Sequence, residues 1–429
     1  MNIAFHTLGC KVNQFETQAL GLLLSERGHN ITEDFSLADV IVVNSCTVTS
    51  TSDQKSRRII RHLIKEYPNA KIAVCGCLSQ VNPESIKEIN GVSLICGTSG
   101  RSEFVDNIEK ITTVNNNSFT PDNALKRRDF EILPAGGLQG HTRAMLKIED
   151  GCSNFCSYCI IPYSRGPVRS LPPKKAYDEC LQLMSKGYKE IIITGIEISS
   201  YGRDLTPKTD LTDLIAFLCK KFPDIRFRLG SLEPRTVTED FCEKLKGLEN
   251  LCPQFHLSLQ SGSDATLIRM NRKYDTTRYF ESVSLLKKHL PNCAVTTDLI
   301  VGFPGEDETE FSETLSFIEK CGFSSIHIFP YSQRKGTPAA SMPNQLTRSE
   351  KAARVRRASK VSKSMEKSYL ESQLFRELSV LFEEKTDNLW SGHSENYIRV
   401  YVESDNNLKN KVIKVSPSSL YRDGLFCKI

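Results

Sequence analysis

The sequence predicts an α/β protein with an N-terminal doubly wound parallel-sheet domain, a central partial (β/α)6 barrel and a small C-terminal all-β domain. Over the first 115 residues, and again from about His141, apolar stretches of strand length alternate with helix-like stretches. Such alternation is typical of parallel strands joined by crossover helices. Near the C-terminus, short alternating stretches follow one another without helices, which indicates a small β-barrel or sandwich.

The length and composition exclude several classes of protein. A chain of 429 residues exceeds what one hydrophobic core usually organises, so two or three domains are expected. No apolar run approaches the roughly 18 residues that suggest a membrane span. The opening residues, MNIAFHTLGC, lack the pattern of a secretory signal. We therefore expect no membrane contact and a cytoplasmic location.

The N-terminal domain is expected over residues 1–115. Its strand and helix candidates alternate in the order 2–8, 14–28, 38–45, 52–67 and 70–76. The polar segment that follows, residues 116–140, has little to bury and is predicted to be a linker.

The barrel is expected over residues 141–365 and the C-terminal β domain over residues 366–429. Six strand candidates in the barrel lie at 142–148, 189–195, 226–231, 255–260, 294–302 and 324–331. Six such units, separated by helical stretches, predict an open or partial barrel. The short strands of the last domain lie at 377–385, 396–403, 410–416 and 425–429.

Three of the fifteen cysteines, Cys152, Cys156 and Cys159, lie within eight residues of one another. In a chain without an export signal, cysteines are metal ligands or buried thiols more often than disulfides. Structural zinc sites close with four Cys or His ligands, and no second ligand pair stands nearby. An iron–sulfur cluster held by three thiolates instead leaves one iron open to a further ligand.

The pattern C152-SNF-C156-SY-C159 resembles the signature of the radical S-adenosylmethionine enzymes. The resemblance implies a [4Fe-4S] cluster whose open iron is chelated by S-adenosyl-L-methionine, and whose electron breaks a carbon–sulfur bond to give a 5'-deoxyadenosyl radical. Ligand groups in α/β folds project from the carboxyl ends of strands, where further candidates lie. The predicted cofactor-binding residues are Tyr158, Thr194, Gly195, Arg228, Ser231, Glu233, Gln260, Ser261, Asp298, Gly302 and Tyr331.

A second set of cysteines follows three predicted strands of the N-terminal domain. Cys10, Cys46 and Cys77 come directly after these strands. The carboxyl ends of neighbouring parallel strands share one edge of a sheet, so these thiols can converge on one site. Cys75 and Cys96 lie nearby in the sequence and are alternatives to Cys77.

The stretches TLGCKVNQFET, VVNSCTVT and CGCLSQ resemble the methylthiotransferase branch of the radical enzymes, and this resemblance covers essentially the full chain. It implies a second [4Fe-4S] cluster on Cys10, Cys46 and Cys77, a radical S-adenosylmethionine barrel, and a C-terminal domain of the TRAM type. Sulfur at the second cluster would be methylated by one S-adenosyl-L-methionine, and another molecule would supply the radical. We also expect the amides of Asn13, Asn44 and Gln80 near this cluster.

Glu149 and Glu197 depart from the family pattern, which has Gln and a neutral or basic residue at these places. Their contacts with the cofactor are therefore not implied by the resemblance. The two sets of cysteines do not depend on them.

The phrase LGCKVNQFET is similar to the branch that acts on threonylcarbamoyladenosine in tRNA. It predicts transfer of a methylthio group to carbon 2 of this nucleoside at position 37. The alternatives are isopentenyladenosine in tRNA and an aspartate of a ribosomal protein. A module of another class, with structural clusters for electron transfer or RNA binding, would not cleave the cofactor.

The expected partners are the tRNA anticodon stem-loop and an electron donor such as flavodoxin or ferredoxin. Residues 348–367 contain eight Lys or Arg against two Glu, and residues 55–65 form a second basic patch. Each patch is either a solvated helix face or a surface that contacts RNA phosphates. In the first patch, Ala352, Val355, Ala358, Val361 and Met365 are expected to pack inward and the basic residues to face outward.

Overall fold

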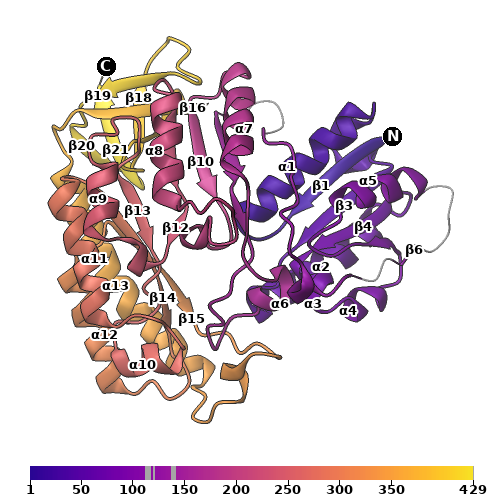
Figure 1. The fold of residues 1–429 in the computed structure, drawn as a ribbon, viewed down its shortest axis with the longest axis horizontal. Helices are drawn as coiled ribbons and strands as arrows, with labels where there is room; N and C mark the ends of the chain where they lie inside the picture. The colour runs from indigo at the N-terminus through magenta and orange to yellow at the C-terminus, as the bar shows by residue number, and fades with distance from the viewer. Residues whose placement is uncertain (112–116, 119–120, 137–141, 429) are drawn as a thin grey trace.

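The computed structural model describes residues 1–111, 117–118, 121–136 and 142–428 (Figure 1). It confirms the predicted α/β class, with parallel sheets in the first two parts and an antiparallel-rich sheet at the C-terminus. Some predicted segments lie outside the described residues. They are parts of the linker (116, 119–120 and 137–140), the start of the barrel (141) and the last residue (429).

The N-terminal part is a parallel sheet in the order β2-β1-β3-β4-β5-β6. Its strands are β1 (Asn2–Thr7), β2 (Asn30–Thr32), β3 (Val40–Ser45), β4 (Lys71–Gly76), β5 (Val92–Ile95) and β6 (Asn117–Ser118). Its helices are α1 (Lys11–Glu26), α2 (Ser50–Glu66), α3 (Cys77–Val81), α4 (Glu84–Lys87) and α5 (Arg101–Lys110). Apolar clusters cover both faces of this sheet, so the doubly wound arrangement is confirmed.

The central part contains the six predicted strand positions, all parallel, in two sheets. The first has the order β11-β10-β7 and the second β12-β13-β14-β15. The strands are β7 (Arg143–Lys147), β10 (Glu190–Thr194), β11 (Arg226–Leu229), β12 (Ser231–Leu232), β13 (Gln254–Leu257), β14 (Ala294–Val301) and β15 (Ser325–Pro330). Because β11 and β12 are separated only by Gly230, they occupy one strand position of a partial barrel.

Helices cover the outside of this barrel, except α6, which packs against α3 of the N-terminal part, and one apolar cluster fills the space beneath them. The helices are α6 (Ile161–Arg165), α7 (Pro173–Ser185), α8 (Leu211–Lys221), α9 (Glu239–Leu245), α10 (Asp264–Arg269), α11 (Thr276–His289) and α12 (Glu308–Cys321). A small antiparallel pair, β8 (Glu149–Asp150) and β9 (Arg169–Ser170), flanks the central cysteines. Single 3-10 turns lie at Phe35–Leu37, Ala124–Lys126, Ile198–Ser200, Pro234–Thr236 and Pro338–Ser341.

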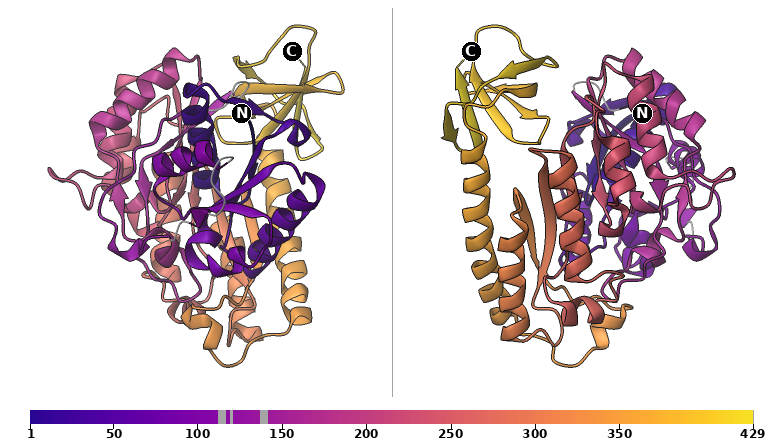
Figure 2. Two further views of the ribbon diagram at one scale, coloured as in Figure 1. Left: turned by 90° about the vertical axis from the view of Figure 1, so that its right-hand side faces the viewer. Right: turned by 60° about the vertical axis from the view of Figure 1, so that its left-hand side comes forward.

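Helix α13 (Arg348–Ser372) connects the barrel to the C-terminal sheet (Figure 2, right). It starts with a capping box between Thr347 and Glu350, as expected for a strong helix start. The sheet has the order β19-β16-β17-β18-β21-β20. Its strands are β16 (Leu378–Thr386), β17 (Leu389–Ser394), β18 (Arg399–Glu403), β19 (Val412–Val415), β20 (Ser419–Tyr421) and β21 (Gly424–Lys428). The boundary predicted at 365/366 therefore falls inside α13.

The inward face of α13 packs on the barrel through Val355, Ala358, Val361 and Met365, as its periodicity predicts. The expectation that Arg354 faces outward is wrong. Arg354 Nη1 pairs with the buried Glu306, and its guanidinium lies over Phe311. A buried carboxylate requires a cation, and periodicity on one helix does not reveal such a partner on another element.

Within the described residues, no helix combines the length and apolar character that crossing a membrane requires.

Candidate active site

The loop that carries Cys152, Cys156 and Cys159 lies between β8 and α6. Backbone hydrogen bonds hold it, from Cys152 N to the carbonyl of Gly166 at 3.0 Å and from Cys159 N to that of Cys156 at 2.9 Å. The three thiols are close enough for their charges to interact. The structure therefore brings together the cysteines that the spacing selects.

Arg272 is a site residue that the sequence analysis missed. Its Nη1 lies 3.1 Å from Cys156 Sγ, and its Nε donates to the hydroxyl of Tyr274 at 2.9 Å. A buried guanidinium beside a sulfur stabilises the thiolate form, which is the form that binds iron. Because 116 residues separate Arg272 from Cys156 and no motif surrounds it, only the fold reveals this contact.

The cysteine groups fit a cluster better than a single metal ion. Among the described residues, Glu239, Glu243 and His289 form the one group of three ligands whose ligand atoms all lie within 4.8 Å of one another. The thiolates that hold an iron–sulfur cube bind different irons, so they do not need to meet at one point. Burial raises the pKa of Cys159 to about 12 and that of Cys77 to about 11, so these thiols stay protonated at neutral pH unless a metal binds them.

The second set of cysteines also converges. Cys10 caps the start of α1, Cys46 follows β3 directly, and Cys77 begins α3. Cys77 interacts electrostatically with both Cys10 and Cys46. Gly9 adopts a φ of +110°, and a Cβ at this position would lie 3.2 Å from Cys46 Sγ, so the turn before Cys10 requires glycine.

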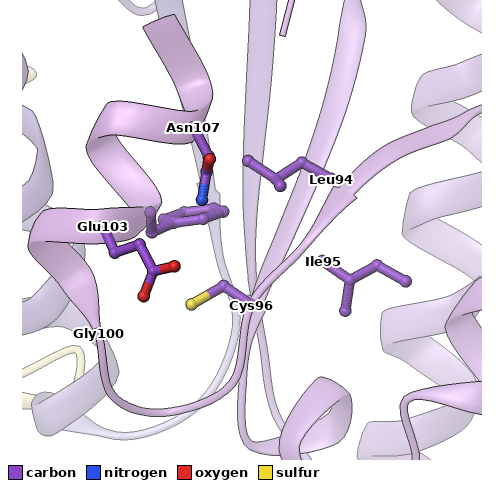
Figure 3. A pocket seen from close by; sticks show the side chains of 7 residues that line it. Leu94, Ile95, Cys96, Gly100, Glu103 and Asn107 are labelled. Carbon is purple, nitrogen blue, oxygen red and sulfur yellow. The ribbon is translucent and has the colours of Figure 1, made fainter. Parts of the chain in front are cut away.

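The two alternatives to Cys77 lie elsewhere. Cys75 is part of β4 and packs in the apolar cluster between the sheet and helices α1 and α5. Cys96 lines a small pocket with Gly100 and Glu103 of the α5 end, and its thiol donates to the carbonyl of Ser99 at 3.3 Å (Figure 3). Neither shows an interaction with Cys10 or Cys46 within the part of the chain that the structure describes.

The three amides predicted to lie near the second cluster have different hydrogen-bond partners. Asn13 Nδ2 donates to the carbonyl of Ser45 at 3.1 Å, and Asn44 Nδ2 donates to the carbonyl of Asn13 at 3.0 Å. These two amides therefore order the backbone beside the cysteines. Gln80 Nε2 instead donates to the carbonyl of Asp122 at 2.7 Å, toward the loop after β6.

Arg165 connects the two cysteine loops. It ends α6, just after Cys159, and α6 packs against α3, which begins at Cys77. Its Nη2 donates to Asn13 Oδ1 at 2.8 Å, and its Nη1 pairs with Glu16 on α1. Arg165 thus crosses from the barrel to the N-terminal sheet close to Cys77.

Glu16 is the centre of a buried charge cluster at this junction. Arg101 Nη2 lies 2.7 Å from Glu16 Oε2, Lys147 Nζ lies 3.4 Å from Oε1, and Arg165 contacts both oxygens. Burial opposes ionisation of Glu16, but the neighbouring cations outweigh it and hold its pKa below the usual value of 4.5. The cluster ties α1 and α5 of the N-terminal part to β7 and α6 of the central part.

Replacing Glu16 with Gln should lower the free energy of unfolding by about 3 kcal/mol, because it leaves buried cations without their partner. Chemical denaturation at pH 7 measures this change. Since the folded state lowers the pKa of Glu16, its contribution is present above pH 4.5 and is lost as the pH falls below that value. The exposed pair of Glu84 and Lys87 is the control, and Glu84→Gln should change stability little. Equal effects of the two substitutions would contradict the structural role of the cluster.

Beside the central triplet, two glutamates, Glu149 and Glu197, lie next to the predicted residue Gly195, which follows the predicted residue Thr194 at the end of β10. Glu149 Oε2 accepts from the backbone N–H of Glu197 at 2.6 Å, and a Cβ on Gly195 would lie 2.9 Å from this oxygen. Oε1 of each glutamate is buried without a hydrogen-bond partner among the described residues. Burial raises the pKa of both carboxyls. A buried carboxyl group whose second oxygen lacks a hydrogen-bond partner can accept a hydrogen bond from a cationic ligand, such as the amino group of S-adenosyl-L-methionine.

Three aromatic side chains, Tyr158, Phe303 and Tyr331, pack together beside the central loop. Tyr158 meets Phe303 edge to face at 6.3 Å between ring centroids, and Phe303 meets Tyr331 at 5.2 Å. Gly302 lies directly under α13, because a Cβ there would lie 2.4 Å from Lys351 Cγ. Tyr158, Gly302 and Tyr331 therefore stay predicted cofactor residues, and the ring contacts join Tyr158 and Tyr331 through Phe303.

Asp298 lies between two histidines in the barrel. It is 3.2 Å from His256 Nε2 and 3.3 Å from His327 Nδ1. The backbone N–H of Gln260, which has a φ of +71°, donates to the carbonyl of Asp298 at 2.9 Å. His327 stands in the same strand-end stretch as the predicted Tyr331, whereas His256 was not expected, because it occurs singly in a strand.

Other predicted cofactor residues lie apart. Arg228 pairs with Glu190 at 2.8 Å and donates to the carbonyl of Ser394 at 3.0 Å, so it joins the barrel to the C-terminal sheet. Ser261 is buried against Thr314 of α12. Glu233 is bound by Arg235 at 2.9 Å, and Ser231, at the start of β12, is exposed. A position at a strand end does not determine which way a side chain points.

Residues 146–318 match the Radical SAM superfamily, and residues 2–97 match uncharacterized protein family UPF0004. A relative from Bacillus subtilis, threonylcarbamoyladenosine tRNA methylthiotransferase MtaB, is 38% identical over all of this chain and 96% of its own length. The protein of that name from Thermotoga maritima is 35% identical over 92% of this chain and 90% of its own. A tRNA-2-methylthio-N(6)-dimethylallyladenosine synthase from Clostridium botulinum is 37% identical over 82% of this chain and 79% of its own.

Solved structures share the fold. The radical S-adenosylmethionine methyltransferase TsrM from Kitasatospora setae, solved with cobalamin and a [4Fe-4S] cluster, superposes with a TM-score of 0.59. It is 13% identical and covers 79% of this chain and 74% of its own. The cobalamin-dependent enzyme OxsB reaches a TM-score of 0.53 at 13% identity, over 86% of this chain and 56% of its own.

Proposed function

Because this chain belongs to the radical S-adenosylmethionine methylthiotransferase family, we propose that it transfers a methylthio group to carbon 2 of N6-threonylcarbamoyladenosine at position 37 of tRNA. It is an enzyme that uses S-adenosyl-L-methionine and a [4Fe-4S] cluster. The observation that supports the proposal is the packing of α3, which begins at Cys77, against α6, which follows Cys159, with Arg165 of α6 bonded to Asn13 and Glu16 of the N-terminal part.

Cys152, Cys156 and Cys159 would hold the cluster that reduces the cofactor, with Glu149 and Glu197 beside its amino group. A second cluster on Cys10, Cys46 and Cys77 is supported by their convergence on one sheet edge. When bound, the groups supply a radical at the first site and sulfur at the second. The chain itself would position the thiolates, with Arg272 beside Cys156 Sγ and Tyr158 packed against Phe303.

A basic surface next to the second triplet supports tRNA as the substrate. Residues 55–65 of α2 carry Lys55, Arg57, Arg58, Arg61 and Lys65, none of which forms an ion pair within the described part of the chain. Unpaired cations are available to RNA phosphates, so the anticodon stem-loop is the proposed partner. We further propose a cytoplasmic enzyme that receives its electrons from a donor such as flavodoxin or ferredoxin.

The test uses anaerobically reconstituted protein, S-adenosyl-L-methionine, a reductant and three anticodon stem-loops. Adenosine 37 is unmodified in the first, threonylcarbamoylated in the second and dimethylallylated in the third. Mass spectrometry should detect the methylthio group mainly on the second stem-loop. Preference for the third would overturn the assigned substrate. Modification of none of them, with 5'-deoxyadenosine still formed, would favour a ribosomal protein, and no 5'-deoxyadenosine at all would indicate clusters with a structural role.

A further inference from the structure

A histidine and two glutamates, remote in sequence from both sets of cysteines, have the composition of a metal site. Glu239 and Glu243 lie one helical turn apart on α9, and His289 is the last residue of α11, which packs against α9. One ligand atom from each of these residues lies within 4.8 Å of the other two. Imidazole and carboxylate together are common ligands of divalent transition-metal ions.

The burial of His289 separates this group from an ordinary acidic surface. The side chains of Glu239 and Glu243 are slightly more than half exposed, and such carboxylates alone do not make a site. The side chain of His289 is only 6% exposed. Its Nε2 lies 2.8 Å from Glu239 Oε1, and its Nδ1 lies 2.9 Å from Glu243 Oε1. Each ring nitrogen of a buried histidine therefore faces a carboxylate oxygen.

A single proton on the imidazole ring does not satisfy both contacts. A neutral imidazole has one N–H, so at its other nitrogen a lone pair faces the lone pairs of a carboxylate. This contact is unfavourable unless the ring takes up a second proton or a cation lies between the two atoms. Nε2 of His289 is buried and forms no hydrogen bond to the residues that the structure describes. An imidazolium would donate one from this nitrogen, so the geometry favours a cation beside Nε2.

The two glutamates suit different roles around such a cation. In many metal sites one ring nitrogen of a histidine binds the ion, and a carboxylate holds the N–H of the other nitrogen. Glu243, beside Nδ1, is placed for the second role, and Glu239, beside Nε2, for binding the ion. Lys288 Nζ lies 3.0 Å from the same Glu239 oxygen and therefore competes with an ion. Its side chain is 65% exposed, so it can move into water at little cost.

The group lies at the end of the barrel where the strands begin. His289 lines a cleft of about 760 Å³ between the barrel and the C-terminal sheet, together with Lys189, Asp224 and Pro253, which stand just before β10, β11 and β13. The central cysteines instead follow the carboxyl ends of strands. In α/β barrels the carboxyl ends carry the chemistry, whereas groups at the opposite end contribute to stability. An ion at His289 would therefore have a structural role.

We propose that His289 Nε2 and the Glu239 carboxylate bind a divalent transition-metal ion, with Glu243 holding the other ring nitrogen of His289. The ion joins the first turn of α9 to the last residue of α11, and water completes its coordination. This site is independent of the proposed function, because it needs neither cluster, cofactor nor RNA.

The experiment titrates Mn²⁺ into reconstituted full-length protein, kept anaerobic and without reductant or RNA. Oxidised [4Fe-4S] clusters are diamagnetic, so electron paramagnetic resonance then reports free and bound Mn²⁺, and electron spin echo spectra detect nitrogen bound to the ion. The variants are Glu239→Gln, Glu243→Gln and Lys288→Met. Asp240→Asn is the matched control, because Asp240 is an exposed carboxylate of the same helix that pairs with Lys244. Iron content and circular dichroism show that each variant is folded.

The wild-type protein should bind one Mn²⁺ ion with a nitrogen ligand. Glu239→Gln and Glu243→Gln should each weaken binding by about 10-fold or more, and Asp240→Asn should leave it unchanged. Lys288→Met should tighten binding about two- to fivefold, because it removes the competing ammonium. Absence of bound Mn²⁺ would overturn the proposal and identify His289 as an imidazolium between two carboxylates. Bound Mn²⁺ without nitrogen coupling, or with equal affinity in Glu239→Gln, would place the ion elsewhere and overturn it as well.

Discussion

Replacing Cys152, Cys156 and Cys159 together with Ala should abolish formation of 5'-deoxyadenosine and leave about four irons per chain. The reason is that these thiolates hold the iron that binds the cofactor, whereas the other triplet lies on a different sheet with its own supports. Iron and sulfide analysis after anaerobic reconstitution measures the remaining cluster. Chromatography of the nucleoside products measures cofactor cleavage.

Loss of all iron in that triple variant would mean that the cysteines form a single site, which contradicts two clusters. Persistent cofactor cleavage would contradict the assignment of the central triplet. The reciprocal variant, with Cys10, Cys46 and Cys77 replaced, is the matched control. It should keep about four irons and still form 5'-deoxyadenosine, but it should not modify tRNA.

Replacing Cys77 alone with Ala should abolish methylthiolation and reduce the iron content by about half, because a cube held by two thiolates is labile. Cofactor cleavage should remain. Cys75→Ala and Cys96→Ala are the matched controls, since both residues are buried cysteines of the N-terminal part that pack in one apolar cluster. Both controls should keep two clusters and full activity.

Loss of the second cluster in Cys75→Ala, with Cys77→Ala intact, would reverse this assignment. The backbone explains why Cys75 and Cys77 lie in different surroundings. Gly76, with a φ of +99°, turns the chain between the two cysteines, and a Cβ there would lie 2.4 Å from Asn44 Oδ1. This turn leaves Cys75 in the core and carries Cys77 to the sheet edge.

The alternation of strands and helices was sufficient to predict the fold, because hydrophobic periodicity reflects which face of each element is buried. The central cysteine triplet stands out by its spacing, and Cys10 and Cys46 by their positions after strands, whereas the choice of Cys77 over Cys75 and Cys96 comes from the resemblance to the family. The contacts of Arg272 and Arg165 could not be predicted. Arg165 meets Glu16 across 149 residues, and although Glu16 lies in the stretch TLGCKVNQFET, nothing in that stretch identifies Arg165 as its partner.

Arg228 is a residue that the sequence selected as a cofactor contact but whose side chain has other partners in the structure. Its place near a strand end suggested a cofactor contact, but its guanidinium is bound by Glu190 and by carbonyls of the C-terminal sheet. That sheet is encoded more than 150 residues later, and nothing in the local sequence indicates that it packs on this end of the barrel. Similarly, Arg354 has a buried partner, Glu306, on a different element.

The charge cluster around Glu16 has a consequence for how RNA is handled. Opening a gap between α1 and the barrel would separate the Glu16 carboxylate from Lys147 and Arg165 and leave these buried charges unpaired, so we expect the N-terminal part and the barrel to behave as one rigid unit. A nucleotide at position 37 is stacked in the anticodon loop. We therefore expect the loop to unstack and present its base to a preformed site, at a cost of a few kcal/mol that falls on the nucleic acid.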